Sequence, residues 1–149
     1  MTFFFQVIFS VVLASPNQFG DDTLVDKAYN ESNPNQSLEL LAQIKNAQDL
    51  TDSLRSKYLL TKGIAHGQLG RVDSSLYFLE ECIQLSLNDG NEYYAMRGFN
   101  AKGVLLKHQG QSESSISSFQ EALAISEKYS ERKFRVAQSE ALGNMAGVF

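Results

Sequence analysis

The sequence contains few of the residues that metal and redox sites need. Among its 149 residues there are one cysteine, Cys82, and two histidines, His66 and His108, and there is no tryptophan. One cysteine cannot form a disulfide within the chain, and a zinc site normally takes several cysteine and histidine ligands. The sequence therefore predicts no disulfide framework, no metal centre and no cofactor.

Positive charge is also scarce. The 13 Lys+Arg are outnumbered by 17 Asp+Glu, which gives a formal net charge of −4 at pH 7. Proteins that bind nucleic acid neutralise its phosphates with clustered Lys and Arg side chains. We therefore expect no nucleic-acid partner for this segment.

Proline is rare and confined to the start of the chain. The two prolines are Pro16 and Pro34, so residues 35–149 lack the strongest helix breaker. In this stretch apolar residues recur at helical spacing, as at Leu79 and Ile83, and alternating patterns typical of strands are scarce. The sequence therefore predicts an all-α fold.

Long apolar runs are absent except at the N-terminus. There, residues 3–14 are mostly apolar and are followed by polar and acidic residues. Val12 and Ala14 are small residues at the −3 and −1 positions of a cut after Ala14. This pattern is typical of a secretory signal peptide, although no Lys or Arg precedes the run. We predict a signal peptide at residues 1–14 and an exported, periplasmic or otherwise extracytoplasmic protein.

Two other interpretations of the N-terminal run stay open. It can be a helix or strand that packs on the domain, in which case the protein is cytoplasmic. It can also be a membrane anchor, but twelve residues of helix reach only about 18 Å, against a hydrocarbon core of roughly 30 Å.

Residues suited to helix starts and turns divide the proline-free stretch. Side chains of Asp, Asn and Ser accept hydrogen bonds from the free N–H groups of a first helical turn. Expected helix starts lie at Asp52, Asp73, Asn91 and Ser112. Glycine permits the left-handed conformation that often ends a helix. Expected turns lie at Gly70, Gly90 and Gly110.

Comparison of the chain with itself shows a repeat of 40 residues. A shift of that size places residues 59–98 over residues 99–138 with seven identical pairs. The pairs are Lys62/Lys102, Gly63/Gly103, Gly70/Gly110, Ser74/Ser114, Ser75/Ser115, Glu81/Glu121 and Ser86/Ser126. A period of this length is typical of a solenoid, in which each unit packs on its neighbours.

The repeated positions have residue types that suit helix packing. A glycine at 63 or 103 lets two helices approach closely, and a large side chain such as Phe119 fills the space beside a small one such as Ala122. Gly143 is the next residue in the series of Gly63 and Gly103. The predicted repeat-packing residues are Gly63, Gly70, Ser75, Leu79, Cys82, Gly103, Gly110, Ser115, Phe119, Ala122 and Gly143.

The order of these residues resembles the tetratricopeptide repeat (TPR) family. Ser75 and Ser115 stand where the family prefers alanine. The family's usual period is about 34 residues, so the chain resembles a 40-residue variety, as in exported bacterial repeat proteins and sensor regions. The resemblance implies a right-handed α-solenoid of stacked antiparallel helix pairs, incomplete at the C-terminus.

The repeat register divides the chain into units. The expected units are a degenerate first repeat at 21–50, TPR-like repeats at 56–95 and 96–135, and the start of a further repeat at 136–149. An unrelated helical cap is the alternative for residues 21–50. Apolar residues such as Leu142 would be bare in the last unit, so we expect the chain to belong to a longer protein or to associate through this end.

The resemblance also implies a ligand groove on the concave face, lined by the first helix of each repeat. The groove candidates are Lys57, Leu60, Ile64, Gln68, Arg97, Asn100, Val104, Lys107 and His108. Arg97, Lys107 and His108 are the best candidates for an anionic or C-terminal ligand group. The alternative is that all of these are ordinary solvated positions.

No catalytic residue is predicted. We expect His66 to pack in the core and Cys82 to be a buried small residue, because Ala122 takes its place in the next repeat. No group of residues combines a nucleophile, a base and an oxyanion donor.

The sequence thus favours a non-catalytic scaffold that binds a protein or peptide in the groove. The alternative is the extracytoplasmic sensory segment of a larger bacterial signalling protein, either a histidine kinase or a transcriptional regulator. In that case the output domain, and a possible membrane tether, lie beyond Phe149.

Overall fold

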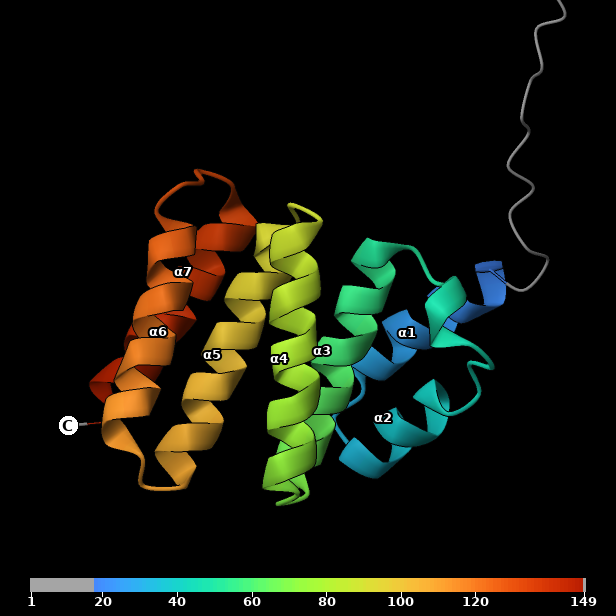
Figure 1. Cartoon of the computed structure of the whole chain (residues 1–149), viewed down its shortest axis with the longest axis horizontal. Coiled ribbons are helices and arrows are strands. Elements are labelled where there is room, and N and C mark those ends of the chain that lie inside the picture. The colour runs from blue at the N-terminus through green and yellow to red at the C-terminus, as the bar shows by residue number, and fades with distance from the viewer. Residues whose placement is uncertain (1–17, 149) are drawn as a thin grey trace, which may run out of the picture.

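A computed structural model describes residues 18–148 of the chain, so the predicted signal peptide at residues 1–14 lies outside the described residues. The described part is built from helices and contains no strand (Figure 1). The α-helices are α1 (Gln18–Asn30), α2 (Pro34–Leu41), α3 (Asp52–Gln68), α4 (Val72–Asn88), α5 (Glu92–His108), α6 (Ser112–Ser126) and α7 (Arg132–Ala146). A short 3₁₀ helix, η1 (Ala47–Asp49), lies between α2 and α3. The all-α prediction is confirmed.

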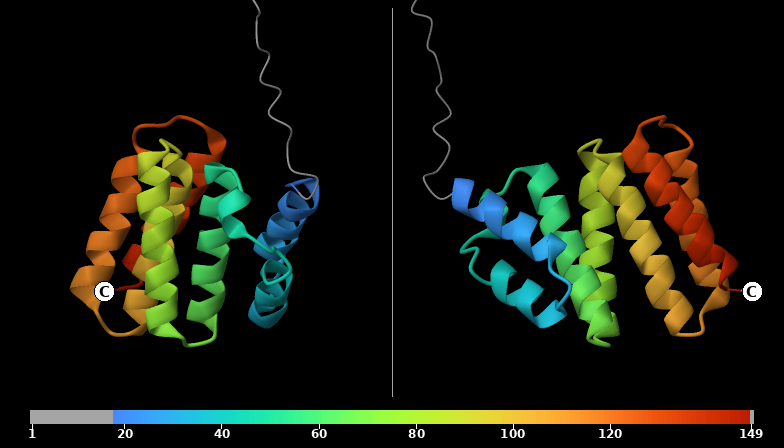
Figure 2. Two further views of the ribbon diagram at one scale, coloured as in Figure 1. Left: turned by 45° about the vertical axis from the view of Figure 1, so that its right-hand side comes forward. Right: turned by 180° about the vertical axis from the view of Figure 1, so that it is seen from behind.

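The helices are arranged as a row of antiparallel pairs. The pairs are α1 with α2, α3 with α4 and α5 with α6, and α7 follows at the end of the row (Figures 1 and 2). The second helix of each pair also packs on the first helix of the next, as α4 does on α5 and α6 on α7. This is the packing of a TPR-like helical solenoid.

The helix starts follow the 40-residue period of the sequence. The helices α3, α5 and α7 begin at Asp52, Glu92 and Arg132, each 40 residues after the last, and α4 and α6 begin at Val72 and Ser112, also 40 residues apart. These first helices begin four residues before the expected unit boundaries at 56, 96 and 136.

The three expected glycine turns have left-handed backbone. Gly70, Gly90 and Gly110 have φ values of 70°, 74° and 72°. At the end of α3 the N–H of Gly70 bonds to the carbonyl of Gly67, and the N–H of Arg71 bonds to that of His66. This pair of bonds satisfies carbonyls left free at the end of the helix.

The expected side-chain caps at the helix starts are mostly absent. Thr51, rather than Asp52, caps α3 and accepts from the N–H of Leu54 at 3.4 Å. The starts of α4, α5 and α6 have no side-chain cap bond. Asn91, for example, turns its amide away and donates to the Ser53 hydroxyl at 2.9 Å. The short turns fix these starts without caps, because the preceding glycine already reverses the chain.

Two glycines lie at helix contacts that leave no room for a side chain. A Cβ on Gly63 would lie 2.7 Å from the Leu79 side chain, and one on Gly103 would lie 2.6 Å from the Phe119 ring. The two contacts are equivalent members of successive pairs. They bring α3 against α4 and α5 against α6, and both Leu79 and Phe119 are fully buried there.

A buried serine links the two helices of each pair. Its hydroxyl donates to a carbonyl of the first helix: Ser75 to Gly63 at 2.7 Å, Ser115 to Gly103 at 2.8 Å and Ser37 to Ala28 at 2.9 Å. Because α1 and α2 share this bond, they are the counterpart of the later pairs, in the region where a degenerate first repeat was expected.

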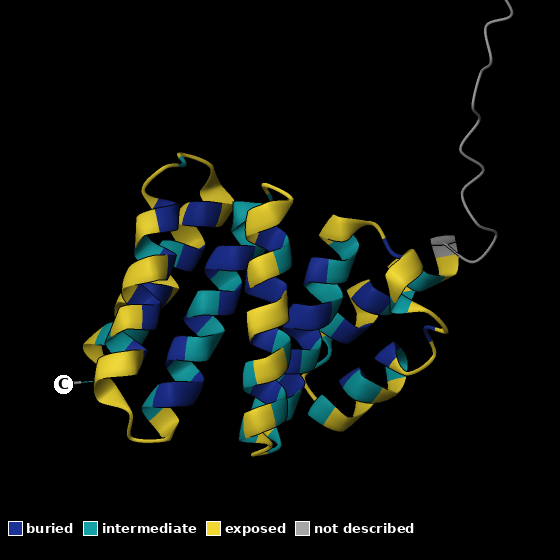
Figure 3. Ribbon diagram, viewed as in Figure 1, coloured by how far each residue is buried: buried dark blue, intermediate teal, exposed yellow. Residues whose placement is uncertain are grey.

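The core continues along the row in three clusters of buried residues (Figure 3). The first joins Val25, Leu41 and Leu50 of the N-terminal part. The second includes Leu60 and Cys82 between α3 and α4. The third, which includes Met96, Ala122, Phe134 and Ala137, joins α5, α6 and α7. Each pair thus shares apolar surface with its neighbours.

The expected packing role of Gly143 is not realised among the described residues. A Cβ on Gly143 would have nothing within 4 Å. Helix α7 packs on α5 and α6 but has no following helix in residues 18–148. The surface that Gly63 and Gly103 bury against a second helix is therefore bare in α7.

Candidate functional site

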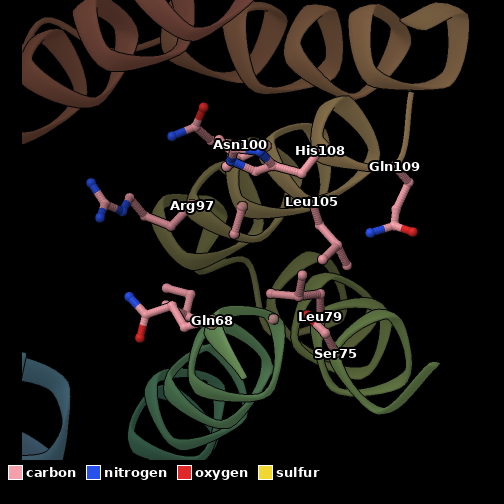
Figure 4. A pocket seen from close by; sticks show the side chains of 12 residues that line it. Gln68, Ser75, Leu79, Arg97, Asn100, Leu105, His108 and Gln109 are labelled. Carbon is pink, nitrogen blue, oxygen red and sulfur yellow. The ribbon is translucent and has the colours of Figure 1, made fainter. Parts of the chain in front are cut away.

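The main cavity lies between α3, α4 and α5 and has a volume of about 350 Å³ (Figure 4). Its apolar wall combines side chains of all three helices. These are Ile64, Leu79, Ala101, Val104 and Leu105. Gly67 also lines the cavity, and the lack of a side chain there keeps the space beside Ser75 and Leu105 open.

Polar side chains border this apolar wall. They are Gln68, Arg97, Asn100, His108 and Gln109. The tips of Gln68, Arg97 and Asn100 lie on one side of the cavity and Gln109 lies on the other (Figure 4). Three of the five are uncharged amides, which can both donate and accept hydrogen bonds.

A second cavity of about 220 Å³ adjoins the first. Both are lined by Ile64, Gln68 and Arg97, and the second adds Tyr29 from the end of α1 and Ser37 from α2. Together they form a groove that runs from α1 across α3 to α5. We call it the α3–α5 groove.

The charge of Arg97 is balanced within the protein. Its guanidinium donates to the Glu140 carboxylate of α7 at 2.6 Å. One turn later the Asn144 amide donates to the Asn100 side-chain oxygen at 3.1 Å. These bonds hold α7 beside α5 and leave the groove without an unpaired arginine.

The structure places six of the nine predicted groove residues along the main cavity. They are Ile64, Gln68, Arg97, Asn100, Val104 and His108. The other three lie elsewhere. Lys57 pairs with Asp26 of α1 at 2.6 Å and lies over the Tyr29 ring, and the Lys107 ammonium donates to the Asn144 carbonyl at 3.3 Å.

Leu60 does not line the groove, and its assignment there is corrected. It is fully buried in the cluster that contains Leu59, Leu79 and Cys82. At this level of α3 the neighbouring helices close over the first-helix surface, and Tyr94 of α5 packs against the same cluster. The groove opens only one turn later, at Ile64.

The three residues predicted to bind an anion do not come together at the cavity. Arg97 and His108 line it, Arg97 is paired with Glu140, and Lys107 bonds to α7. An anionic group in the groove would thus meet a compensated arginine rather than a cluster of free cations.

Sequence reasoning missed several lining residues. Ala101 lies one turn after Arg97 on the same face of α5, so helical spacing could have identified it. Gly67, Leu105 and Gln109 face a neighbouring helix pair rather than the expected first-helix surface, and their place depends on how α5 sits against α4. Tyr29 enters because α1 ends beside α3.

Neither His66 nor Cys82 belongs to a catalytic arrangement. His66 stacks on Phe78 with ring centroids 5.4 Å apart, and its buried Nδ1 has no hydrogen-bond partner. Burial, then the nearby charges of Arg71 and Lys62, lower the pKa of His66. Burial raises the pKa of Cys82 to about 12, and its thiol lies 3.2 Å from the Ser56 carbonyl oxygen.

Two further searches cover the described residues only. Residues 18–148 hold no group of three or more His, Cys, Asp or Glu side chains that could bind a metal ion. No helix among them is both long enough and apolar enough to span a membrane.

Comparison with known families agrees with this architecture. The match is to the tetratricopeptide repeat family and covers residues 97–129, from the first turns of α5 through the end of α6. Residues 97–129 are a tetratricopeptide repeat. This TPR supplies one wall of the α3–α5 groove, and α3 with α4 supply the other. No curated protein and no solved structure matches the chain.

The match states the coarse role of the molecule. TPRs are modules of protein–protein interaction and are typically scaffolds without catalytic activity. In this chain the TPR is stacked on further helix pairs with the same glycine contact and the same serine bond.

Proposed function

We propose that the α3–α5 groove binds an extended or helical segment of another protein and takes an uncharged, apolar side chain into its main cavity. The observation that carries this proposal is the composition of the cavity wall. Ile64, Ala101 and Val104 provide apolar contact, and the bordering arginine is already paired with Glu140 at 2.6 Å.

The size of the cavity suits one large apolar side chain of a ligand. Burial of a Leu, Ile or Phe side chain contributes about 1.5–3 kcal/mol, which is a substantial part of the affinity of a short peptide. The amides of Gln68, Asn100 and Gln109 are placed to bond the polar backbone on either side. The apolar contact supplies affinity and the amides orient the peptide.

Selection from a phage-displayed library of random peptides tests the proposal on the 149-residue chain. We expect selected peptides to share an apolar residue and to bind the Val104→Lys variant at least tenfold more weakly, because the new ammonium enters the cavity. Leu87→Lys is the matched control, since Leu87 is exposed on α4 outside the cavity. Circular dichroism checks that both variants fold.

A preference for acidic peptides would contradict this proposal. Such peptides would bind less well in high salt and to Arg97→Ala, as expected for an anion site. That result would restore the anion site first inferred from Arg97, Lys107 and His108.

We also propose that the protein is exported and that the groove works outside the cytoplasm, either in a free scaffold or in the sensory segment of a signalling protein. The apolar run at residues 3–14 supports export. Mass spectrometry of the protein recovered from the periplasm or medium tests this. Cleavage after Ala14 is expected, and an uncleaved chain found only in the cytoplasm would contradict it.

A further inference from the structure

Helix α7 carries apolar and small residues on a face that nothing covers in residues 18–148. Val136 is 50% exposed and Leu142 is 47% exposed. Gly143 lies one residue further and has nothing within 4 Å of a Cβ position. We call the surface formed by Arg132, Val136, Leu142 and Gly143 the α7 outer face.

The equivalent positions of the two preceding first helices are closed. Ser56 of α3 and Met96 of α5, which precede Val136 by 80 and 40 residues, are 0% and 1% exposed. Gly63 is covered by Leu79 of α4, and Gly103 is covered by Phe119 of α6. The covering element is in each case the second helix of the pair.

Each covering helix presents the same series of residues. In α4 these are Ser75, Leu79 and Cys82, and in α6 they are Ser115, Phe119 and Ala122. The serine hydroxyl bonds to the glycine carbonyl, the large side chain lies on the glycine, and the small residue is buried beside the first half of the first helix.

Gly143 has no structural need that residues 18–148 explain. Glycine in a helix interior lowers helix stability relative to alanine, because it loses more conformational freedom on folding. At Gly63 and Gly103 a Cβ would collide with the covering helix, so glycine is required. At Gly143 the same requirement arises only when a helix covers this face.

The charge at the start of α7 indicates the charge of the covering helix. At the equivalent place in α5, the Glu92 carboxylate accepts from Lys128 at 3.2 Å and from the Tyr129 hydroxyl at 3.1 Å, just after the end of α6. Helix α7 begins with Arg132 instead, so the sign is reversed. A complementary helix would carry an acidic residue there.

We propose that the α7 outer face docks an antiparallel helix of another protein. This helix carries a serine, a large apolar residue four positions later, a small residue seven positions later and an acidic residue near its C-terminal end. A second copy of the chain does not supply it, because α4 and α6 already bury these residues within their own pairs. The surface is separate from the α3–α5 groove, so the two proposals fail or succeed independently.

A peptide copy of α6 tests the proposal on the 149-residue chain. The probe is a fluorescein-labelled peptide of residues 111–129 with Lys128→Glu. A hydrocarbon staple between positions 120 and 124, which are exposed in α6, holds it helical. Fluorescence anisotropy is expected to show saturable binding. A probe with Phe119→Ala is expected to bind at least tenfold more weakly, because the seat at Gly143 is left empty.

Variants of the chain locate the binding site. Gly143→Leu is expected to weaken binding at least tenfold, since its side chain fills the seat. Gly20→Leu is the matched control, because Gly20 also has nothing within 4 Å but lies in α1. The probe that keeps Lys128 is expected to bind several-fold more weakly to the wild type and to regain affinity for Arg132→Glu.

Three results would overturn the proposal. One is equal binding of the probe to wild type and Gly143→Leu, both folded by circular dichroism. Another is no measurable binding of either probe. The third is a dimer of the free chain, seen by light scattering, that Gly143→Leu dissociates, because a second copy would then occupy the α7 outer face.

Discussion

Buried serine hydroxyls join the paired helices at the residue scale. Ser37, Ser75 and Ser115 are almost fully buried, and each donates to a carbonyl that already belongs to a helix. A buried hydroxyl is costly unless it is bonded, so the residue fits only where the two helices hold that carbonyl within reach. The alanine preferred by the family needs no such partner.

Removal of one of these hydroxyls should weaken its pair. We expect Ser115→Ala to be less stable than Ser117→Ala by about 1 kcal/mol, because only Ser115 loses an interhelical hydrogen bond. The comparison cancels the helix propensity of alanine, since both residues lie in α6 and Ser117 is exposed. Urea unfolding followed by circular dichroism measures the difference. Equal stabilities would show that the bond contributes nothing net.

His66 should make stability depend on pH. Its pKa is lowered in the folded protein, chiefly by burial, so the unfolded chain takes up the proton first as the pH falls below about 6.5. The stabilisation present above that pH is therefore lost as the pH falls toward the folded-state pKa. We expect the urea midpoint to fall from pH 7.5 to pH 5.5, and to fall less in His66→Leu.

The leucine variant is a natural choice because Leu106 holds the equivalent position in the next repeat. NMR titration of the His66 ring checks the cause directly and should give a pKa below that of the unfolded chain. An equal pH dependence in the variant and the wild type would assign the effect to other groups.

Close packing of helix pairs depends at the element scale on where a glycine meets a large side chain. Gly63 meets Leu79 and Gly103 meets Phe119, at distances that exclude any Cβ. Gly70, Gly90 and Gly110 serve a different purpose, since their positive φ angles form the turns and no atom lies near a Cβ position. The same residue type thus sets helix separation in one place and chain reversal in another.

Alanine substitutions should separate covered from bare helix glycines. We expect Gly103→Ala to lower the free energy of unfolding by about 1–3 kcal/mol, because its Cβ would lie 2.6 Å from the Phe119 ring. Gly143→Ala should instead raise it by about 0.5–1 kcal/mol, since helix propensity improves and nothing is displaced. Denaturant unfolding of both variants is the measurement. A loss of stability in Gly143→Ala would mean that the space beside it is filled.

The whole molecule is a row of helix pairs in which each unit contacts only its neighbours. Its ends differ from its centre, because α2 has 8 residues where α4 has 17, and α7 has no paired helix in residues 18–148. The α7 end is held to α5 by the Arg97–Glu140 ion pair and by the bond between Asn100 and Asn144. Stability should therefore be lowest at both ends.

Amide hydrogen exchange should show this gradient. We expect the slowest exchange in α3 to α6, where both helices of each pair are long and buried against each other, and faster exchange in α1, α2 and α7. Mass spectrometry of exchanged peptides measures it. Uniform protection along residues 18–148 would indicate that the row unfolds as one cooperative unit.

Much of the fold could be predicted from local patterns. The 40-residue period gave the helix pairs, because the same spacing of apolar and small residues recurs in each unit, and the turn glycines followed from their backbone freedom. Helix caps were predicted less well. Asp52, for example, looked suited to cap α3, but Thr51 occupies the capping position. Such choices depend on a backbone geometry that one residue can shift.

The groove shows the limit of the sequence most clearly. Helical spacing identified Ile64, Arg97 and Val104 as members of one surface, because residues one turn apart share a helix face. Only the tertiary structure decided that Leu60 is covered by its neighbours and that Arg97 is paired with Glu140, 43 residues away. The sequence by itself determined which faces of the helices pack, since that follows from local periodicity. Which charges remain free in the groove was decided by contacts between distant elements, and no local pattern encodes them.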